Sequence, residues 1–235
     1  MVRWIILLFF FASCHVAAFE FSVTESEFNS WDKRCKTAYA GSIVGRNSRF
    51  FRDMTPQQSA EARKFGEAAG GAWHYCAGLI LLQRAASTIG NERNSNLQSA
   101  LLEIRFTYNK IKPEHPWYAE VHIDYAKALI TSGDKRDGFA VLNRLIQTLP
   151  DNSLPYTALA FYLRRENKLE QAIECLQSAP ELLKNDSAEL NYFLGWYSME
   201  AGNIGGAVDY AKRAYALNYP VQALRQRLAQ QGHNL

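Results

Sequence analysis

An internal repeat of about 34 residues constrains this chain more than any other feature of its sequence. Small residues recur at that spacing in the first half of each unit and again in the second half. The first set is Ala126, Ala160 and Gly195, and the second is Gly138, Ala172 and Ala207. Between the halves stand residues suited to a left-handed turn, Gly133, Asn167 and Gly202. Such a period indicates stacked supersecondary units, none of which buries its apolar face alone.

Over about residues 119 to 221 these repeats are similar to the tetratricopeptide repeat (TPR) family, whose unit of 34 residues is a helix, a turn and a second helix. The resemblance implies an all-α fold: helix-turn-helix repeats stacked as a short right-handed α-solenoid with a C-terminal capping helix. Three TPR-like repeats are expected over 116–221, and a capping helix and tail over 222–235. In the capping segment Val221, Leu224 and Leu228 stand at helical spacing.

Gly195 lies inside an apolar helical segment, where it costs about 1 kcal/mol relative to alanine. We expect glycine there because paired helix axes approach to about 8 to 10 Å only where the facing residues are small. The expected facing pairs are Gly195 with Ala207, Ala160 with Ala172, and Ala126 with Gly138.

Residues 56–115 read as a divergent helical hairpin. Thr55 is a helix N-cap followed by Pro56, and the helix continues to about Ala86 unless Gly70 and Gly71 break it in two. A polar loop over 88–96 and a second helix over 94–111 are expected to follow.

Residues 19–55 are predicted to pack on the first of these helices. Phe28, Trp31, Cys35 and Tyr39 share one face of a predicted amphipathic helix, which a turn at Gly41 and Gly45 follows.

The first 18 residues are typical of a signal peptide, with one arginine, an apolar run from Trp4 to Ala12, and a cleavage pattern ending at Ala18. The run has about half the roughly 20 residues that a membrane span needs. Alternatively, residues 11–14 resemble the lipobox of bacterial lipoproteins, in which Cys14 would be acylated. Both interpretations predict an exported protein, periplasmic or envelope-associated, and lipid-anchored if Cys14 is acylated.

Three cysteines follow the leader: Cys35, Cys76 and Cys175. Two of three can pair in an oxidising compartment, and we favour Cys35 with Cys76 because Cys175 falls in a repeat core. The alternative is three buried free thiols.

The net charge and composition limit the classes of partner that the chain is expected to bind. The net charge of +3 is too mild to indicate nucleic-acid binding, and 48% apolar residues indicate a folded chain. One basic stretch with interleaved Phe50 and Phe51 permits contact with a membrane surface or an acidic partner. Its basic residues are Lys33, Arg34, Lys36, Arg46, Arg49 and Arg52.

The sequence carries no recognised catalytic motif, and we predict no catalytic residue, cofactor or metal. His74 and Cys76 are two residues apart, so on a helix they point in nearly opposite directions. His115, His122 and Asp124 form at best a weak metal-binding group, since no second cluster supports them.

The TPR resemblance implies a concave groove lined by the first helix of each repeat. In register, its residues are Lys127, Ile130, Phe161, Arg164, Arg165, Tyr192, Trp196 and Met199. Aromatic and basic side chains of this kind are frequent at interfaces, so we expect an extended or helical peptide with apolar side chains and an acidic group. The alternative is that Phe161 and Trp196 belong to the core between repeats.

The expected function is therefore a non-catalytic adaptor or scaffold that binds a peptide or protein partner in the bacterial cell envelope. The layout also resembles pilotin-like lipoproteins of type IV pili and the TPR subunits of cytochrome c maturation, which implies an assembly factor. An alternative of another class is an enzyme or ligand-binding protein with its site in residues 19–113, where a closed pocket near His74 would favour it.

Overall fold

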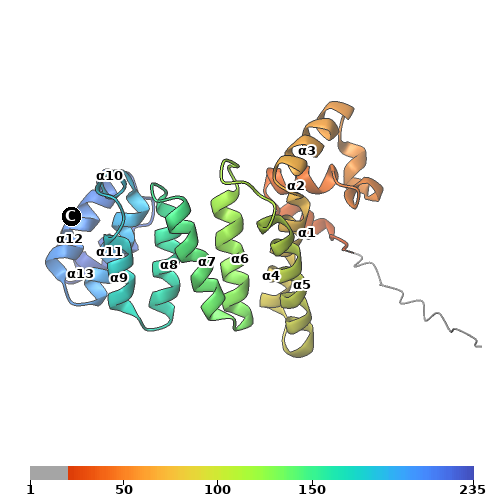
Figure 1. The fold of residues 1–235 in the computed structure, drawn as a ribbon. Coiled ribbons are helices and arrows are strands. Elements are labelled where there is room, and N and C mark those ends of the chain that lie inside the picture. The colour runs from red at the N-terminus through yellow and green to blue at the C-terminus, as the bar shows by residue number, and fades with distance from the viewer. Residues whose placement is uncertain (1–20) are drawn as a thin grey trace, which may run out of the picture.

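The structure is a computed structural model that describes residues 21–235. Within that range the chain forms α-helices and two short 3-10 helices, with no strand. Four helix pairs stand side by side in a row, and the N-terminal helices lie at one end of it (Figure 1). The pairs are α4 (Ala72–Ser87) with α5 (Gly90–Tyr108), α6 (Tyr118–Ser132) with α7 (Lys135–Thr148), α8 (Ser153–Arg165) with α9 (Leu169–Gln177), and α11 (Ala188–Glu200) with α12 (Ile204–Ala216). The all-α solenoid expected from the sequence is thus observed.

The turns inside the last three pairs use the residues that the repeat placed there. Gly133 has φ of 102°, Asn167 of 59° and Gly202 of 80°. These left-handed conformations suit glycine and asparagine, and they end the first helix of each pair.

Two of the three expected close approaches inside the pairs are observed. A Cβ on Gly195 would lie 3.2 Å from the Ala207 carbonyl oxygen, and one on Gly138 would lie 2.9 Å from that of Ala126. Ala160 and Ala172 are both fully buried in one core cluster. Small residues therefore let the paired backbones pack almost directly on each other.

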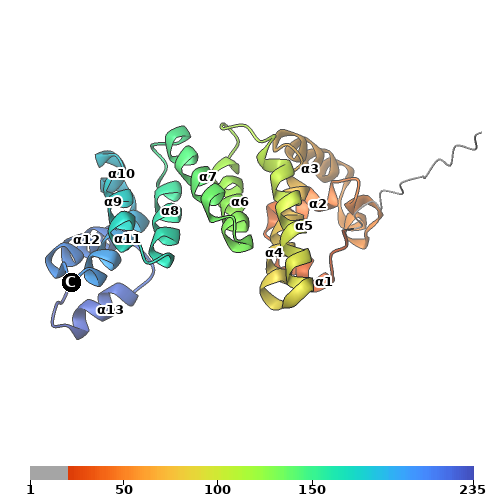
Figure 2. The same cartoon turned by 60° about the horizontal axis from the view of Figure 1, so that its bottom comes forward.

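The C-terminal end is closed by α13 (Ala223–Gln230), which lies across the last pair in Figure 2. Leu224 and Leu228 are fully buried, whereas Val221 precedes the helix and is 44% exposed. A Cδ atom of Leu224 lies 2.8 Å from where a Cβ of Gly195 would be, so Gly195 accommodates the cap as well as its partner helix.

One short helix, α10 (Glu181–Asp186), was not predicted. It stands between α9 and α11, starts after Pro180 and has no buried residue. Pro180 occupies the N-cap position, with a non-helical ψ of 147°.

The helices observed over residues 56–115 differ in detail from the predicted hairpin. Gly70 and Gly71, with φ of 66° and 89°, separate α3 (Pro56–Ala68) from α4, which matches the alternative of two helices. The predicted polar loop over 88–96 is wrong, because α5 begins at Gly90 and its first turns carry those polar residues on an exposed side. The hairpin itself is α4 with α5.

The single helix predicted through Phe28 and Tyr39 is also wrong. Two short helices, α1 (Glu25–Ser30) and α2 (Lys33–Ala40), are separated at Trp31. The cause is Asp32, whose carboxylate accepts a hydrogen bond from the Cys35 backbone N–H at 3.0 Å and so starts a new helix. The aromatic side chains still cluster, with Trp31 and Tyr39 ring centroids 5.4 Å apart. Two 3-10 turns, η1 (Gly45–Asn47) and η2 (Arg49–Asp53), lead to α3.

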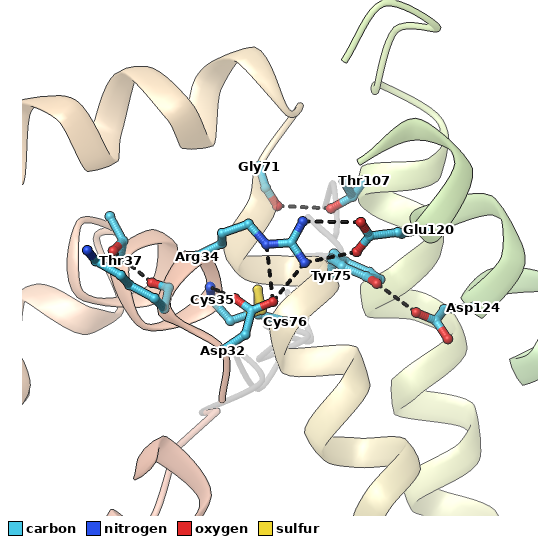
Figure 3. The surroundings of a disulfide bond; sticks show 11 residues. Asp32, Arg34, Cys35, Thr37, Gly71, Tyr75, Cys76, Thr107, Glu120 and Asp124 are labelled. Carbon is cyan, nitrogen blue, oxygen red and sulfur yellow. Dashed lines mark hydrogen bonds and ion pairs between the residues drawn. A yellow bond between two sulfur atoms is a disulfide. The ribbon is translucent and has the colours of Figure 1, made fainter. Parts of the chain in front are cut away.

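Three long-range links attach the N-terminal helices to the first two pairs. Cys35 on α2 forms a disulfide bond with Cys76 on α4, the pair favoured by the sequence (Figure 3). Arg34 donates two hydrogen bonds of 3.1 Å to Glu120 on α6. Arg84 on α4 donates to Glu27 on α1 at 2.6 Å and lowers the pKa of that carboxyl to about 2.

The predicted signal peptide and Cys14 lie outside the described residues. Within residues 21–235, no helix has both the length and the apolar character needed to cross a bilayer.

Replacing Gly195 with leucine is expected to lower the free energy of unfolding by about 1 to 3 kcal/mol, because the side chain would meet Leu224 and the backbone of α12. Gly205→Leu is the matched control. A Cβ at Gly205 meets no atom within 4 Å, so that change should be neutral or stabilising by up to about 1 kcal/mol. Chemical denaturation of both variants measures the difference, and equal stabilities would contradict the observed close approach.

Removing the disulfide by a Cys35→Ser and Cys76→Ser double change is expected to lower the free energy of unfolding by about 2 to 4 kcal/mol. The two cysteines are 41 positions apart, and the unfolded chain gains conformational freedom when this loop is opened. Cys175→Ser is the control, since that thiol is free. Reductant should destabilise the wild type and leave the double variant unchanged. A wild type insensitive to reductant would count against the pairing.

Candidate functional site

The histidines singled out by the sequence are engaged in packing. His74 lies between Trp73 and Phe106, with ring centroids 3.9 and 3.8 Å away, and its Nδ1 is 2.6 Å from a Glu103 carboxylate oxygen. Its neighbour Cys76 is in the disulfide. The two therefore face different partners, as their spacing indicates.

His115, His122 and Asp124 do not form one cluster. His115 Nδ1 accepts from the Trp117 backbone N–H at 3.0 Å, and Asp124 accepts from the Tyr75 hydroxyl at 2.6 Å (Figure 3). No group of three metal-ligating side chains occurs in the described part of the chain.

His122 is nearly buried between aromatic rings. Its Nδ1–H donates to the Tyr118 carbonyl at 2.8 Å, and the Tyr118 and Tyr108 ring centroids lie 3.9 and 4.5 Å away. Burial, with a smaller contribution from the nearby Arg144, lowers the pKa of His122 to about 4. His122 therefore stays neutral in the folded chain at neutral pH.

The structure brings together five of the eight residues predicted for the groove. A hollow of about 390 Å³ between α8 and α11 is lined by Phe161, Arg164, Arg165, Tyr192 and Trp196. Phe193, Tyr197 and Glu200, which the sequence analysis did not name, complete it.

Tyr192 lines the hollow but is largely engaged in packing, as are two further predicted groove residues, Met199 and Ile130. Tyr192 and Met199 are only 7% exposed and belong to a core cluster, so they contribute packing rather than a free surface. Ile130 packs inside the α6–α7 pair, with its Cγ1 2.5 Å from where a Cβ of Gly138 would be. Tyr192 and Met199 are therefore too buried to face a partner as predicted, and Ile130 contacts α7 rather than lining the hollow.

Arg164 is also less available than predicted. Its guanidinium pairs with the Glu200 carboxylate, which accepts a further hydrogen bond from Trp196 Nε1 at 3.1 Å. Arg227 on α13 lies 5.3 Å from the Trp196 ring centroid. Contacts from two helices thus hold Trp196 in one orientation. This agrees in part with the alternative that Trp196 belongs to the core between repeats.

Phe161 remains a surface residue. Its side chain is 41% exposed, and the Arg165 guanidinium lies 5.7 Å from its ring centroid. The core alternative therefore does not hold for Phe161.

Lys127 lines a different hollow, of about 300 Å³, between α4 and α6. Its other residues are Leu79, Leu82, Gln83, Ala85, Ala86, Arg93 and Thr131. Lys127 is 34 residues before Phe161, which is 35 before Trp196, so the three occupy equivalent positions of successive repeats. Equivalent positions of a solenoid face the same way, and both hollows therefore open on one face. We call this the first-helix face.

Cations predominate on the first-helix face. Arg93, Lys127 and Arg165 form no ion pair among the described residues, although Lys127 acts electrostatically on the Asp124 carboxylate. The lining carboxylate, Glu200, is already paired with Arg164. Glu200 follows Trp196 by four residues, a spacing from which their contact could have been predicted. The contact of Arg227 with Trp196 could not be predicted from such a spacing, because Arg227 lies on another helix.

The basic stretch at residues 33–52 is partly neutralised. Arg34 pairs with Asp32 and Glu120, and Arg49 pairs with Glu25 at 2.6 Å. Phe50 stacks on Phe28 with ring centroids 3.8 Å apart. The side chain of Arg52 is outside the description. These pairings weaken the electrostatic attraction expected toward a membrane surface.

Comparison with known proteins identifies no family for the chain. No family model matches it, and no curated protein matches it. Among solved structures, it is similar to a chain described as "MamA RS-1 ArsTM double mutant", with a TM-score of 0.46 and 15% identity over 79% of this chain and 94% of that one. The all-helical structure itself is compatible with a TPR-like fold.

The buried His122 makes the stability of the folded chain depend on pH. Because its pKa is lower in the folded chain than the ordinary value of 6.5, the unfolded chain binds the extra proton. Stability is therefore full above about pH 6.5 and falls as the pH drops toward 4, by roughly 1 to 3 kcal/mol. His115, whose pKa burial also lowers, acts in the same direction.

Unfolding measured between pH 7 and 4.5 should show a smaller loss for His122→Gln than for the wild type. His233→Gln, in the exposed C-terminal tail, is the control and should follow the wild type. Parallel curves for all three proteins would contradict a neutral buried His122.

Proposed function

We propose that this chain is a non-catalytic protein-interaction scaffold whose first-helix face binds an acidic segment of a partner protein. The observation that carries the proposal is the pair of hollows on that face. One is lined by aromatic rings and by Arg165, and the other by aliphatic side chains with Arg93 and Lys127. An exposed phenylalanine, a fixed tryptophan and arginines match the residue types that contribute most to interfaces.

The side chains on the first-helix face indicate which side chains the partner segment would carry. Apolar side chains of the partner would fill the hollow beside Phe161 and Trp196, and carboxylates would meet Arg165, Lys127 and Arg93. The two hollows belong to different repeats, so an extended segment fits better than a single turn of helix. Because the cations lie at the surface, they would act mainly on association rate and specificity.

We further propose that the protein works in an oxidising compartment, in keeping with an exported envelope protein. The disulfide between Cys35 and Cys76 supports this, because such bonds persist where thiols are not kept reduced. No feature of the first-helix face favours a pilotin-like role over one in cytochrome c maturation.

A peptide-display selection on the whole oxidised chain tests the proposed function. Enriched peptides should combine Asp or Glu with aromatic or aliphatic residues, and their affinity should fall as salt increases. Charge reversal at Lys127 and Arg165 together should weaken the selected peptides by about tenfold or more, equivalent to about 1.4 kcal/mol.

Arg136→Glu is the matched control, since Arg136 on α7 is exposed and lines neither hollow. Phe161→Ala should weaken the same peptides without changing helicity. Selection of peptides without acidic residues, or equal binding by the charge-reversed chain, would refute the proposal.

A further inference from the structure

We propose that a second site, separate from the first-helix face, binds a small aromatic anion. It is a cleft of about 630 Å³ where the N-terminal helices meet the first pair. That volume lies within the range of small-molecule sites in proteins. None of its lining residues belongs to the first-helix face.

The cleft has four structural borders. The end of α2 and the following turn contribute Ala38, Gly41, Ser42, Ile43, Val44 and Arg46, and α3 contributes Ala62, Arg63, Gly66 and Glu67. The glycine turn and the start of α4 contribute Gly70, Gly71, Trp73 and His74, and the end of α5 contributes Phe106 and Lys110. The disulfide and the glycine turn hold these elements together, so the cleft is part of the folded chain.

One wall is aromatic. Trp73, His74 and Phe106 form a continuous stack, with each pair of neighbouring rings inclined by 32°. Phe106 is 37% exposed, although it is a large apolar side chain at a helix end. A flat apolar ligand would cover this surface and remove it from water.

The rim is cationic. Arg46, Arg63 and Lys110 form no ion pair with a described carboxylate, and Lys110 Nζ lies 3.5 Å from the Phe106 ring centroid. Of the nearby carboxylates, Glu67 lines the cleft and Glu103 is held by His74. Three cations against one free carboxylate favour an anionic group beside the aromatic wall.

Glycine at position 66 independently supports a ligand site in the cleft. It lies inside α3, where glycine costs about 1 kcal/mol relative to alanine, and its φ angle is not left-handed. A Cβ there would meet no atom within 4 Å, so neither backbone conformation nor packing in the chain requires glycine. Because Gly66 lines the cleft, the absent side chain leaves space that a ligand would occupy.

The cleft is open rather than closed, since Ile43, Arg46 and Arg63 on its rim are exposed. This shape suits reversible binding. It does not match the closed pocket near His74 that would favour an enzyme.

The experiment uses 8-anilinonaphthalene-1-sulfonate, a fluorescent aromatic anion, with the whole oxidised chain. Its uncharged analogue N-phenyl-1-naphthylamine is the matched probe that lacks the sulfonate. We expect saturable binding of one sulfonate probe per chain in the cleft and weaker binding of the neutral one.

Two variants test the two parts of the site. Arg63→Gln with Lys110→Gln should weaken the sulfonate probe about tenfold and leave the neutral probe unchanged. Gly66→Leu should abolish cleft binding of both, because its side chain projects into the space they would fill. Gly205→Leu and Arg136→Gln are the matched controls, and Phe161→Ala with Trp196→Ala identifies any binding at the first-helix face.

Binding that survives Gly66→Leu would overturn the proposal, as would a preference for the anion that survives the double glutamine change. Loss of binding in the Phe161→Ala, Trp196→Ala chain, or no saturable binding to the wild type, would also overturn it. If Gly66→Leu does not fold, as judged by circular dichroism, the double glutamine variant decides, because it changes only exposed side chains. Peptide binding at the first-helix face is measured separately, so either proposal can fail alone.

Discussion

The architecture depends on close contact between two helix backbones inside each repeat. Glycine or alanine at the facing positions allows this approach, and Gly195 shows the constraint most clearly, because it meets both the backbone of α12 and Leu224 of the cap. The same glycine therefore controls the last repeat and the helix that closes the solenoid. A side chain there would separate the paired helices and displace the cap, and Trp196, which follows directly, would lose its contact with Arg227.

Much of the fold could be predicted because its signals are local. Turn positions such as Gly133 and Asn167 need a left-handed backbone, and Thr55 caps α3 with Gln58 returning the hydrogen bond. The break before α2 depends on Asp32, which caps a new helix. The helical spacing of the aromatic residues on both sides of Asp32 predicted one continuous helix instead. Helical periodicity reports which residues share a face, and it says less about where one helix ends and the next begins.

The site was less predictable, because exposure depends on neighbours distant in sequence. The repeat correctly placed Phe161 and Trp196 at equivalent positions. It could not show that Tyr192 stacks on Tyr219 and becomes buried, or that Arg227 on the cap covers Trp196. The positions on a helix follow from the sequence, whereas the pairing of Arg164 with Glu200 follows from the packing of two helices.

The two proposed sites depend on different parts of the chain. The first-helix face arises from stacking of equivalent repeats, and its geometry is set by small residues within each pair. The cleft arises where unlike elements meet, and its walls are fixed by the Cys35–Cys76 disulfide and by Thr107, which donates a hydrogen bond to the Gly71 carbonyl at 2.9 Å. Reduction of the disulfide would therefore loosen the cleft before the hollow between α8 and α11, because the last three pairs contain none of these links.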